Sequence, residues 1–207
     1  MRAKSFIGLI IVAMLGAGSA PISAGTAPEI QGYWKPLKPI KLAIMGSFGV
    51  SKDAREVPFE AQNPDDIAYN NAFDSIKKKK FGKAISEFDR LLKNNSRYLD
   101  AYYGRGLAYA MQGKYDLAIA DFTRYLEFEQ KDADSYYNRG LARILQGKYD
   151  QGLTDINKAL KLSPSDYWAF YIRGFVYFKK GRVAKAKADY ERALRLNPEL
   201  GEREGKG

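Results

Sequence analysis

Pairs of opposite charge recur at one fixed spacing in this sequence. Three times an arginine precedes an aspartate by sixteen residues: Arg105 and Asp121, Arg139 and Asp155, and Arg173 and Asp189. Residues of these types could form ion pairs that join two helices of one hairpin or two adjacent hairpins, with a value set by burial and geometry. They could also form a row of arginines for an anionic partner. We favour the ion pairs and keep the row as the alternative.

The sequence contains few of the residue types that enzymes use for catalysis. The 207 residues include no Cys and no His, which excludes disulfides, zinc bound by these residues, cysteine nucleophiles and imidazole-based triads. An enzyme would need carboxylates as acid and base, or a Ser and Lys pair. The carboxylates of this chain occupy positions typical of helix caps and ion pairs. We therefore expect no intrinsic enzyme activity, no cofactor and no metal; the alternative is an accessory subunit that completes another enzyme's site.

The charged pairs belong to a longer repetition with a period of 34 residues. RGLAYAMQGKYD at 105–116 returns as RGLARILQGKYD at 139–150, with nine of twelve residues unchanged. The period continues without a gap over 65–200. We expect four units, at 65–98, 99–132, 133–166 and 167–200. Each unit contains two amphipathic segments of about a dozen residues separated by a short turn, which predicts a helical hairpin.

Local signals mark where these helices begin and end. The residues NPDD at 63–66 supply a cap, a first-turn proline and an acidic first turn. Pro164 and Pro198 fall where a second helix must stop. The first turn carries Lys79, whereas the turns of the other three units carry Gly113, Gly147 and Gly181. The first unit is thus the divergent one.

These units resemble the tetratricopeptide repeat family, whose signature sets small, aromatic, Ala and Pro residues along a hairpin of 34 residues. The fourth unit matches with Gly174, Tyr177, Ala186, Tyr190, Ala193 and Pro198. The first unit keeps only Ala72, Ala84 and Phe88. The resemblance covers about two thirds of the chain. It implies an all-α, right-handed α-solenoid of four helix-turn-helix hairpins, with the first helices lining a concave surface, and a non-catalytic interaction scaffold.

The inner positions of the first helices form the candidate peptide-binding groove on this resemblance. They are Tyr69, Asn70, Phe73, Tyr103, Leu107, Tyr137, Asn138, Leu141, Trp168, Tyr171, Phe175 and Lys179. Four of them, Tyr69, Tyr103, Tyr137 and Tyr171, are spaced by one period and form a tyrosine ladder. Aromatic rings with polar tips suit a peptide or partner subunit. The alternative, equally open, is that these rings only pack between adjacent first helices.

One subtype of the family binds the C-terminal carboxylates of its partner through five Lys, Asn and Arg residues in three consecutive repeats. Among the corresponding residues of this chain only Asn138 fits that pattern. We therefore do not expect a carboxylate clamp.

Residues 1–24 have the order of a secretory signal peptide: Arg2 and Lys4, an apolar run from Phe6 to about Ala17, then small residues. The run is too short to cross a bilayer. We expect cleavage after Ala24 and export, to the periplasm in a Gram-negative host and otherwise to the medium. Residues 25–64 are expected to be a linker or docking tract, and 201–207 a tail.

The chain is basic, with a formal net charge of +10. Removal of the signal peptide with Arg2 and Lys4 would leave a net charge of +8. The run KKKK at 77–80 falls at the end of a helix, where positive charge complements the helix dipole. As an alternative, Lys-rich segments could attach an adaptor to anionic lipid or an acidic envelope partner. We expect a protein or peptide partner, with membrane contact secondary and no nucleic acid, because no base-reading motif is present.

Overall fold

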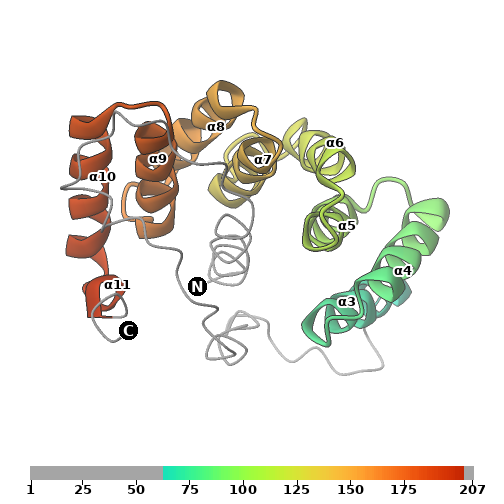
Figure 1. The fold of residues 1–207 in the computed structure, drawn as a ribbon. Helices are drawn as coiled ribbons and strands as arrows, with labels where there is room; N and C mark the ends of the chain where they lie inside the picture. Colours follow the sequence, from blue (N-terminus) through green and yellow to red (C-terminus); the bar gives the residue numbers. More distant parts are fainter. Residues whose placement is uncertain (1–62, 203–207) are drawn as a thin grey trace.

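The computed structural model describes residues 63–202, and every regular element in that range is an α-helix (Figure 1). The helices are α3 (Pro64–Lys77), α4 (Phe81–Asn94), α5 (Leu99–Met111), α6 (Tyr115–Leu126), α7 (Ala133–Leu145), α8 (Tyr149–Leu162), α9 (Tyr167–Lys179), α10 (Val183–Leu196) and the one-turn α11 (Glu199–Glu202). The expected signal peptide at 1–24 lies outside the described residues, as does almost all of the tract at 25–64.

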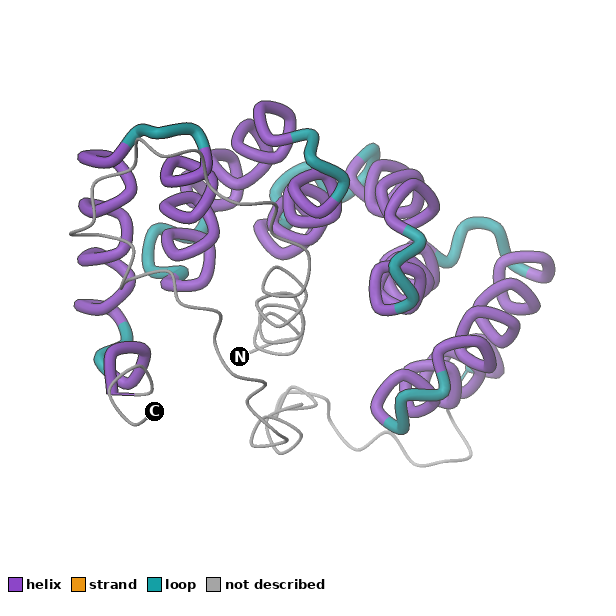
Figure 2. Tube along the Cα trace, viewed as in Figure 1, coloured by secondary structure: helices purple, strands orange, loops and turns teal. Residues whose placement is uncertain are grey.

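The helices pair into hairpins, and each hairpin packs against the next. The second helix of one hairpin contacts the first helix of the following one: α4 with α5, α6 with α7, and α8 with α9. The hairpins follow an arc on which α3, α5, α7 and α9 lie on the inner side and α4, α6, α8 and α10 on the outer side (Figures 1 and 2). The architecture is therefore an α-solenoid, as the sequence predicted.

The turn of the first hairpin has the same shape as the others although it contains no glycine. Lys79 adopts a φ of 57°, close to the 69° to 78° of the three turn glycines. The N–H groups of Lys79 and Lys80 donate to the carbonyls of Ile76 and Ser75, each over 2.8 Å. In the second turn the equivalent N–H groups, of Gly113 and Lys114, donate over 3.0 and 2.9 Å. A lysine thus occupies the left-handed region that glycine adopts without a clash of its Cβ.

The helix ends lie where the local signals placed them. The side chain of Asn63 accepts a hydrogen bond of 3.0 Å from the N–H of Asp65, and Pro64 is the first residue of α3. Helix α8 ends at Leu162 and α10 at Leu196, in each case two residues before a proline.

One hydrophobic core runs through all four hairpins. Close helix approach depends on glycine at two crossings. A Cβ at Gly104 would collide with the ring of Phe88 in the preceding hairpin, and one at Gly140 would lie 3.0 Å from the carbonyl oxygen of Gly152 in its own hairpin. Within residues 63–202 no helix is both long and apolar enough to span a membrane.

The last hairpin ends with a charged outer surface and one extra turn. Lys187 is exposed on α10, where the equivalent Ile85 and Leu153 are buried. The sequence assigned 201–207 to a tail, whereas α11 extends helical structure to Glu202 and packs against α10. Its Leu200 side chain is buried in the core.

Candidate interaction surface

The arginine and aspartate pairs form ion pairs within each of the last three hairpins. In every pair the Nε and Nη2 atoms of the arginine donate to the two carboxylate oxygens of the aspartate sixteen residues later. The two distances are 2.8 and 2.7 Å from Arg105, 2.9 and 2.8 Å from Arg139, and 2.7 and 2.7 Å from Arg173. All three aspartates are buried. This bidentate geometry joins the first helix of a hairpin to the second.

The remaining Nη1 atom of each arginine reaches the hairpin before it. Arg105 donates to Asp89 over 2.7 Å, Arg139 to Thr123 over 3.2 Å, and Arg173 to Asn157 over 2.8 Å. Each arginine therefore joins two hairpins as well as two helices. We call Arg105, Arg139 and Arg173 the arginine ladder.

Aromatic rings and charge hold the arginine ladder in place. The guanidinium of Arg105 lies 5.6 and 5.8 Å from the ring centres of Tyr102 and Tyr109, and that of Arg173 lies 5.3 Å from the ring centre of Phe170. Hydrogen bonds to Asp121 raise the pKa of the Arg105 guanidinium above its ordinary value. These side chains are engaged within the protein, which favours the ion-pair interpretation over a row for an anionic partner.

The tyrosine ladder packs against the second helices in a repeating way. Ring centres of Tyr69 and Phe88, of Tyr103 and Phe122, and of Tyr171 and Tyr190 lie 5.8, 5.9 and 6.2 Å apart, always nineteen residues apart in sequence. The third hairpin has Ile156, an aliphatic residue, at that position, and both Tyr137 and Ile156 belong to the hydrophobic core. The ladder therefore also contributes to the packing within hairpins.

Adjacent first helices are linked through a polar contact on the same face. The Nδ2 group of Asn138 on α7 donates to the hydroxyl of Tyr103 on α5 over 3.1 Å. Asn138 is the residue that matched the carboxylate-clamp pattern, and here its amide group is engaged with a neighbouring helix.

The predicted groove residues differ widely in exposure. Buried ones are Leu107, Tyr137, Asn138, Leu141, Trp168 and Tyr171, and half-buried ones are Tyr69, Phe73, Tyr103, Phe175 and Lys179. Asn70 is exposed. The sequence did not specify the depth at which these side chains lie, and their role as a groove stays a prediction.

Three polar atoms of this face are buried and form no hydrogen bond within residues 63–202. They are the hydroxyl of Tyr137, Oδ1 of Asn138 and Nε1 of Trp168. Burial raises the pKa of the Tyr137 hydroxyl well above its usual value, and the nearby charge of Asp166 raises it further. The hydroxyl therefore stays protonated and can donate. Sequence reasoning missed these atoms because their state depends on burial and on the side chains around them.

Comparison with known protein families identifies the repeats. Two descriptions of the tetratricopeptide repeat match the chain, one over residues 76–136 and the other over residues 133–166 and 167–200. Together they cover more than half of the sequence. A comparison with curated protein sequences gives no match.

Solved structures share the fold at low sequence identity. MamA 41-end from Desulfovibrio magneticus RS-1 aligns with a TM-score of 0.63 at 22% identity, over 67% of this chain and 78% of that one. The Arabidopsis OM64 TPR domain aligns with a TM-score of 0.53 at 22% identity, over 54% of this chain and 93% of that domain. The repeat matches and this shared architecture agree, and the chain belongs to the tetratricopeptide repeat family.

Proposed function

We propose that this protein is a non-catalytic scaffold that binds a peptide segment or a partner subunit on the inner face of its first helices. Tetratricopeptide repeats indicate interaction with a protein partner. The observation that carries the proposal is the coincidence of the tyrosine ladder with the three unpartnered polar atoms of Tyr137, Asn138 and Trp168.

Unpartnered polar atoms favour a partner with a peptide backbone. A buried polar group without a hydrogen bond costs about 1–3 kcal/mol. Nε1 of Trp168 can only donate, Oδ1 of Asn138 can only accept, and the Tyr137 hydroxyl can do both. All three atoms are closed to water in the free protein, so the proposal requires that side chains of the inner face move aside when the partner binds. Backbone N–H and C=O groups then offer the complement to all three, while apolar side chains of the partner cover the surrounding rings.

The hydroxyl of Tyr137 gives a sharp test. The tagged full-length protein captures its partner from its native cells, the partner is identified by mass spectrometry, and affinity is then measured with purified components. Tyr137→Phe removes one unpartnered group, so we expect the free protein to be at least as stable. We expect the affinity to fall about fivefold, which corresponds to about 1 kcal/mol for one hydrogen bond.

Tyr136→Phe is the matched control. Tyr136 precedes Tyr137 in α7 and packs on Arg139, with 5.5 Å between the guanidinium and the ring centre. We expect its affinity to match the wild type. Equal affinity in both variants and the wild type would remove the Tyr137 hydroxyl from the binding surface.

The proposal extends to the cell envelope, on the strength of the sequence of residues 1–24. We propose that the protein is exported and cleaved after Ala24, to the periplasm in a Gram-negative host. N-terminal sequencing of the protein from fractionated cells tests this: the expected first residue is Gly25 in the exported fraction, and a cytoplasmic chain that retains Met1 contradicts it.

A further inference from the structure

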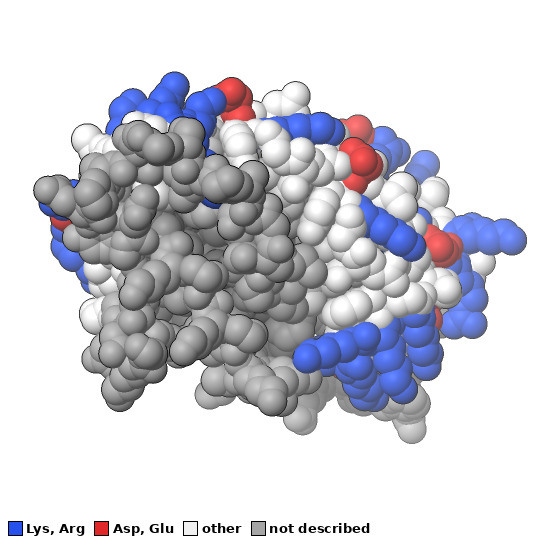
Figure 3. All heavy atoms as spheres, viewed as in Figure 1, with Lys and Arg blue, Asp and Glu red and all other residues white. Residues whose placement is uncertain are grey.

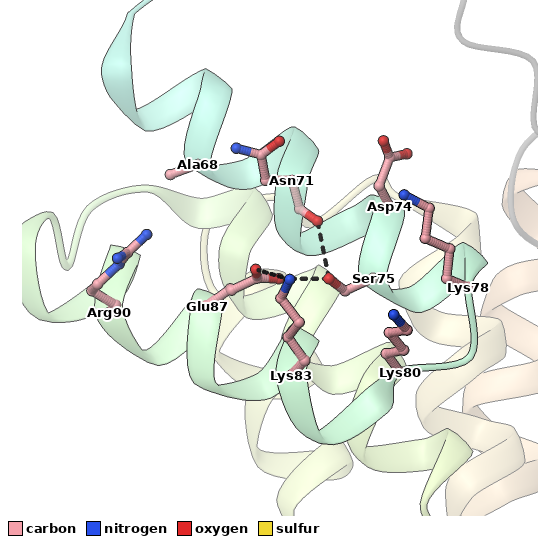
Figure 4. Close-up of a pocket in the computed structure, with 9 residues that line it drawn as sticks. All are labelled: Ala68, Asn71, Asp74, Ser75, Lys78, Lys80, Lys83, Glu87 and Arg90. Carbon is pink, nitrogen blue, oxygen red and sulfur yellow. Dashed lines mark hydrogen bonds and ion pairs between the residues drawn. The ribbon is translucent and has the colours of Figure 1, made fainter.

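Four of the positions at which the first hairpin differs from the other three line one pocket. Ala68, Asn71, Ser75 and Glu87 surround a volume of about 290 Å³ between α3 and α4 (Figure 4). Ala68 replaces an aromatic ring, Asn71 replaces the ladder arginine, and Glu87 replaces the paired aspartate. Ser75 replaces a larger side chain, which elsewhere is Tyr109, Arg143 or Tyr177. The pocket is therefore the place that a guanidinium and a ring fill in each later hairpin.

A basic residue of α4 has also lost its aromatic neighbour. In the third and fourth hairpins Lys158 and Arg192 lie 5.8 and 5.9 Å from the ring centres of Tyr136 and Phe170. The equivalent basic residue of the first hairpin is Arg90, and the equivalent of the ring is Ala68. Arg90 instead lines the pocket.

Positive charge is in excess around the pocket. Its cations are Lys78, Lys80, Lys83 and Arg90, and its acids are Asp74 and Glu87. Both acids have partners: Lys77 binds Asp74 over 2.8 Å, and Glu87 accepts from Ser75 over 2.7 Å and lies 3.6 Å from Lys83. In the part of the chain that the structure describes, Lys78, Lys80 and Arg90 have no ion pair. Figure 4 shows Lys80 and Lys83 extending toward the space between the two helices.

The turn that presents these lysines is strained. Lys79 lies between Lys78 and Lys80 and adopts the left-handed conformation that the other turns give to glycine. That conformation costs roughly 1–2 kcal/mol for a residue with a Cβ. Strain and unneutralised charge therefore occur at the same turn, as they do in sites built for a ligand.

We propose that this first-hairpin pocket binds a carboxylate-rich segment of a protein partner. Lysine amines attract its Asp and Glu side chains, while the Asn71 amide can exchange hydrogen bonds with its backbone. A peptide suits the mixed polar lining better than a membrane does. The exposed large apolar side chains of residues 63–202 are Leu117 and Phe128, which belong to the second hairpin and do not line the pocket.

The pocket is separate from the inner face. On α3, Asn71 follows Tyr69 by two residues, and Ser75 follows Phe73 by two residues. Each step of two residues turns about 200° around the helix axis. The basic side chains that gather over the α3 and α4 hairpin are visible at the surface (Figure 3). The proposed site thus adds a second contact and does not rest on the groove.

Binding of a labelled hexaglutamate peptide to the full chain, followed by fluorescence anisotropy, tests the site. A hexaglutamine peptide of the same length serves as the uncharged comparison. The triple variant Lys78→Gln, Lys80→Gln and Lys83→Gln is expected to bind hexaglutamate at least about tenfold more weakly. The control triple Lys93→Gln, Lys131→Gln and Lys161→Gln removes the same charge at exposed positions, and we expect a change within about twofold.

A variant that refills the pocket separates shape from charge. Ala68→Tyr with Asn71→Arg restores the residues of the later hairpins and raises the net charge by one. We expect this variant, with helical content unchanged, to lose at least about tenfold in affinity for hexaglutamate because the new guanidinium pairs with Glu87.

Four outcomes would overturn the proposal. The first is that the refilled variant binds hexaglutamate as tightly as the wild type, and the second is that both triple variants lose the same affinity. The third is that the wild type shows no measurable binding of hexaglutamate. The fourth is that the protein binds anionic phosphatidylserine vesicles but not the peptide. The last outcome would assign the lysines to a membrane surface.

Discussion

Arg139 and Asp155 form a bidentate ion pair inside the third hairpin, with nitrogen to oxygen distances of 2.9 and 2.8 Å. Arg143 donates to the same carboxylate over 2.7 Å, and the Asp155 residue is only 2% exposed. Two guanidinium groups therefore share one carboxylate. Arg139 also reaches the preceding hairpin, because it donates to Thr123 there.

Removal of this carboxylate should destabilise the protein strongly. Asp155→Ala leaves two arginines without their shared partner, and we expect the free energy of unfolding to fall by about 3–5 kcal/mol in urea titrations. The control is Asp116→Ala, whose side chain is 82% exposed and lies 3.5 Å from Lys148. We expect a change within about 0.5 kcal/mol there. Similar losses in the two variants would show that the ladder does not stabilise the stack.

Glycine at the crossing of α7 and α8 should resist replacement. A Cβ at Gly152 would collide with Ile144 and lie 2.8 Å from the carbonyl oxygen of Gly140. We expect Gly152→Ala to lower the free energy of unfolding by about 1–3 kcal/mol despite the better helix propensity of alanine. At Gly82 in α4 the nearest atom to a Cβ, in the Gln112 side chain, is 3.6 Å away. Gly82→Ala should therefore stabilise the protein by up to about 1 kcal/mol, and stabilisation at both positions would contradict the close approach.

The first turn should improve when its lysine is replaced. Lys79→Gly relieves the left-handed lysine, and we expect the thermal midpoint to rise with a gain of about 1 kcal/mol. Gly147→Ala, which places a Cβ at a φ of 78°, should lower the midpoint by a comparable amount. Calorimetry measures both. A lower midpoint for the glycine variant at the first turn would mean that Lys79 makes a contact worth more than its strain.

Alkaline pH should destabilise the fold through two tyrosines of the ladder, Tyr103 and Tyr137. Burial raises the pKa of Tyr103 and Tyr137 above the ordinary value of about 10. Unfolded tyrosines release their protons near pH 10 while these two keep theirs, so these two groups lower the free energy of unfolding as pH rises above 10 and leave it unchanged below that pH.

Ultraviolet titration of tyrosinate measures this effect. We expect a late phase that coincides with loss of helical signal and that shrinks in the double variant Tyr103→Phe and Tyr137→Phe. A single early phase with helical signal intact would show that the ladder hydroxyls reach water freely.

The period of 34 residues was enough to predict the helical hairpins, because the cap at Asn63 and the turn glycines carry local conformational preferences. The spacing of Arg105 and Asp121 predicted an ion pair because the same spacing of opposite charges recurs in the later hairpins. Lys79 shows the limit of local rules, since the surrounding hairpin imposes a glycine-like turn on it.

The sequence did not predict how deeply the side chains of the inner face are buried, and it did not predict the first-hairpin pocket. Whether Tyr137 is exposed depends on side chains from several helices that meet only in the folded stack. The pocket results from Ala68, Asn71, Ser75 and Glu87 together, and no one of these substitutions implies a cavity. The sequence does mark Asn71 and Glu87 as departures from the repeated pair, which is the signal that could have led to the pocket.

The central claim, that the inner face of the first helices receives a partner, is tested most directly by site-specific photocrosslinking in the native cell. A photoreactive side chain is placed at Asn70 on α3 or Lys179 on α9, and for comparison at Lys187 or Glu191, which are exposed on α10. We predict adducts with the same partner from both inner positions and none from α10. Crosslinks from α10 alone, or equally from all four positions, would contradict the account.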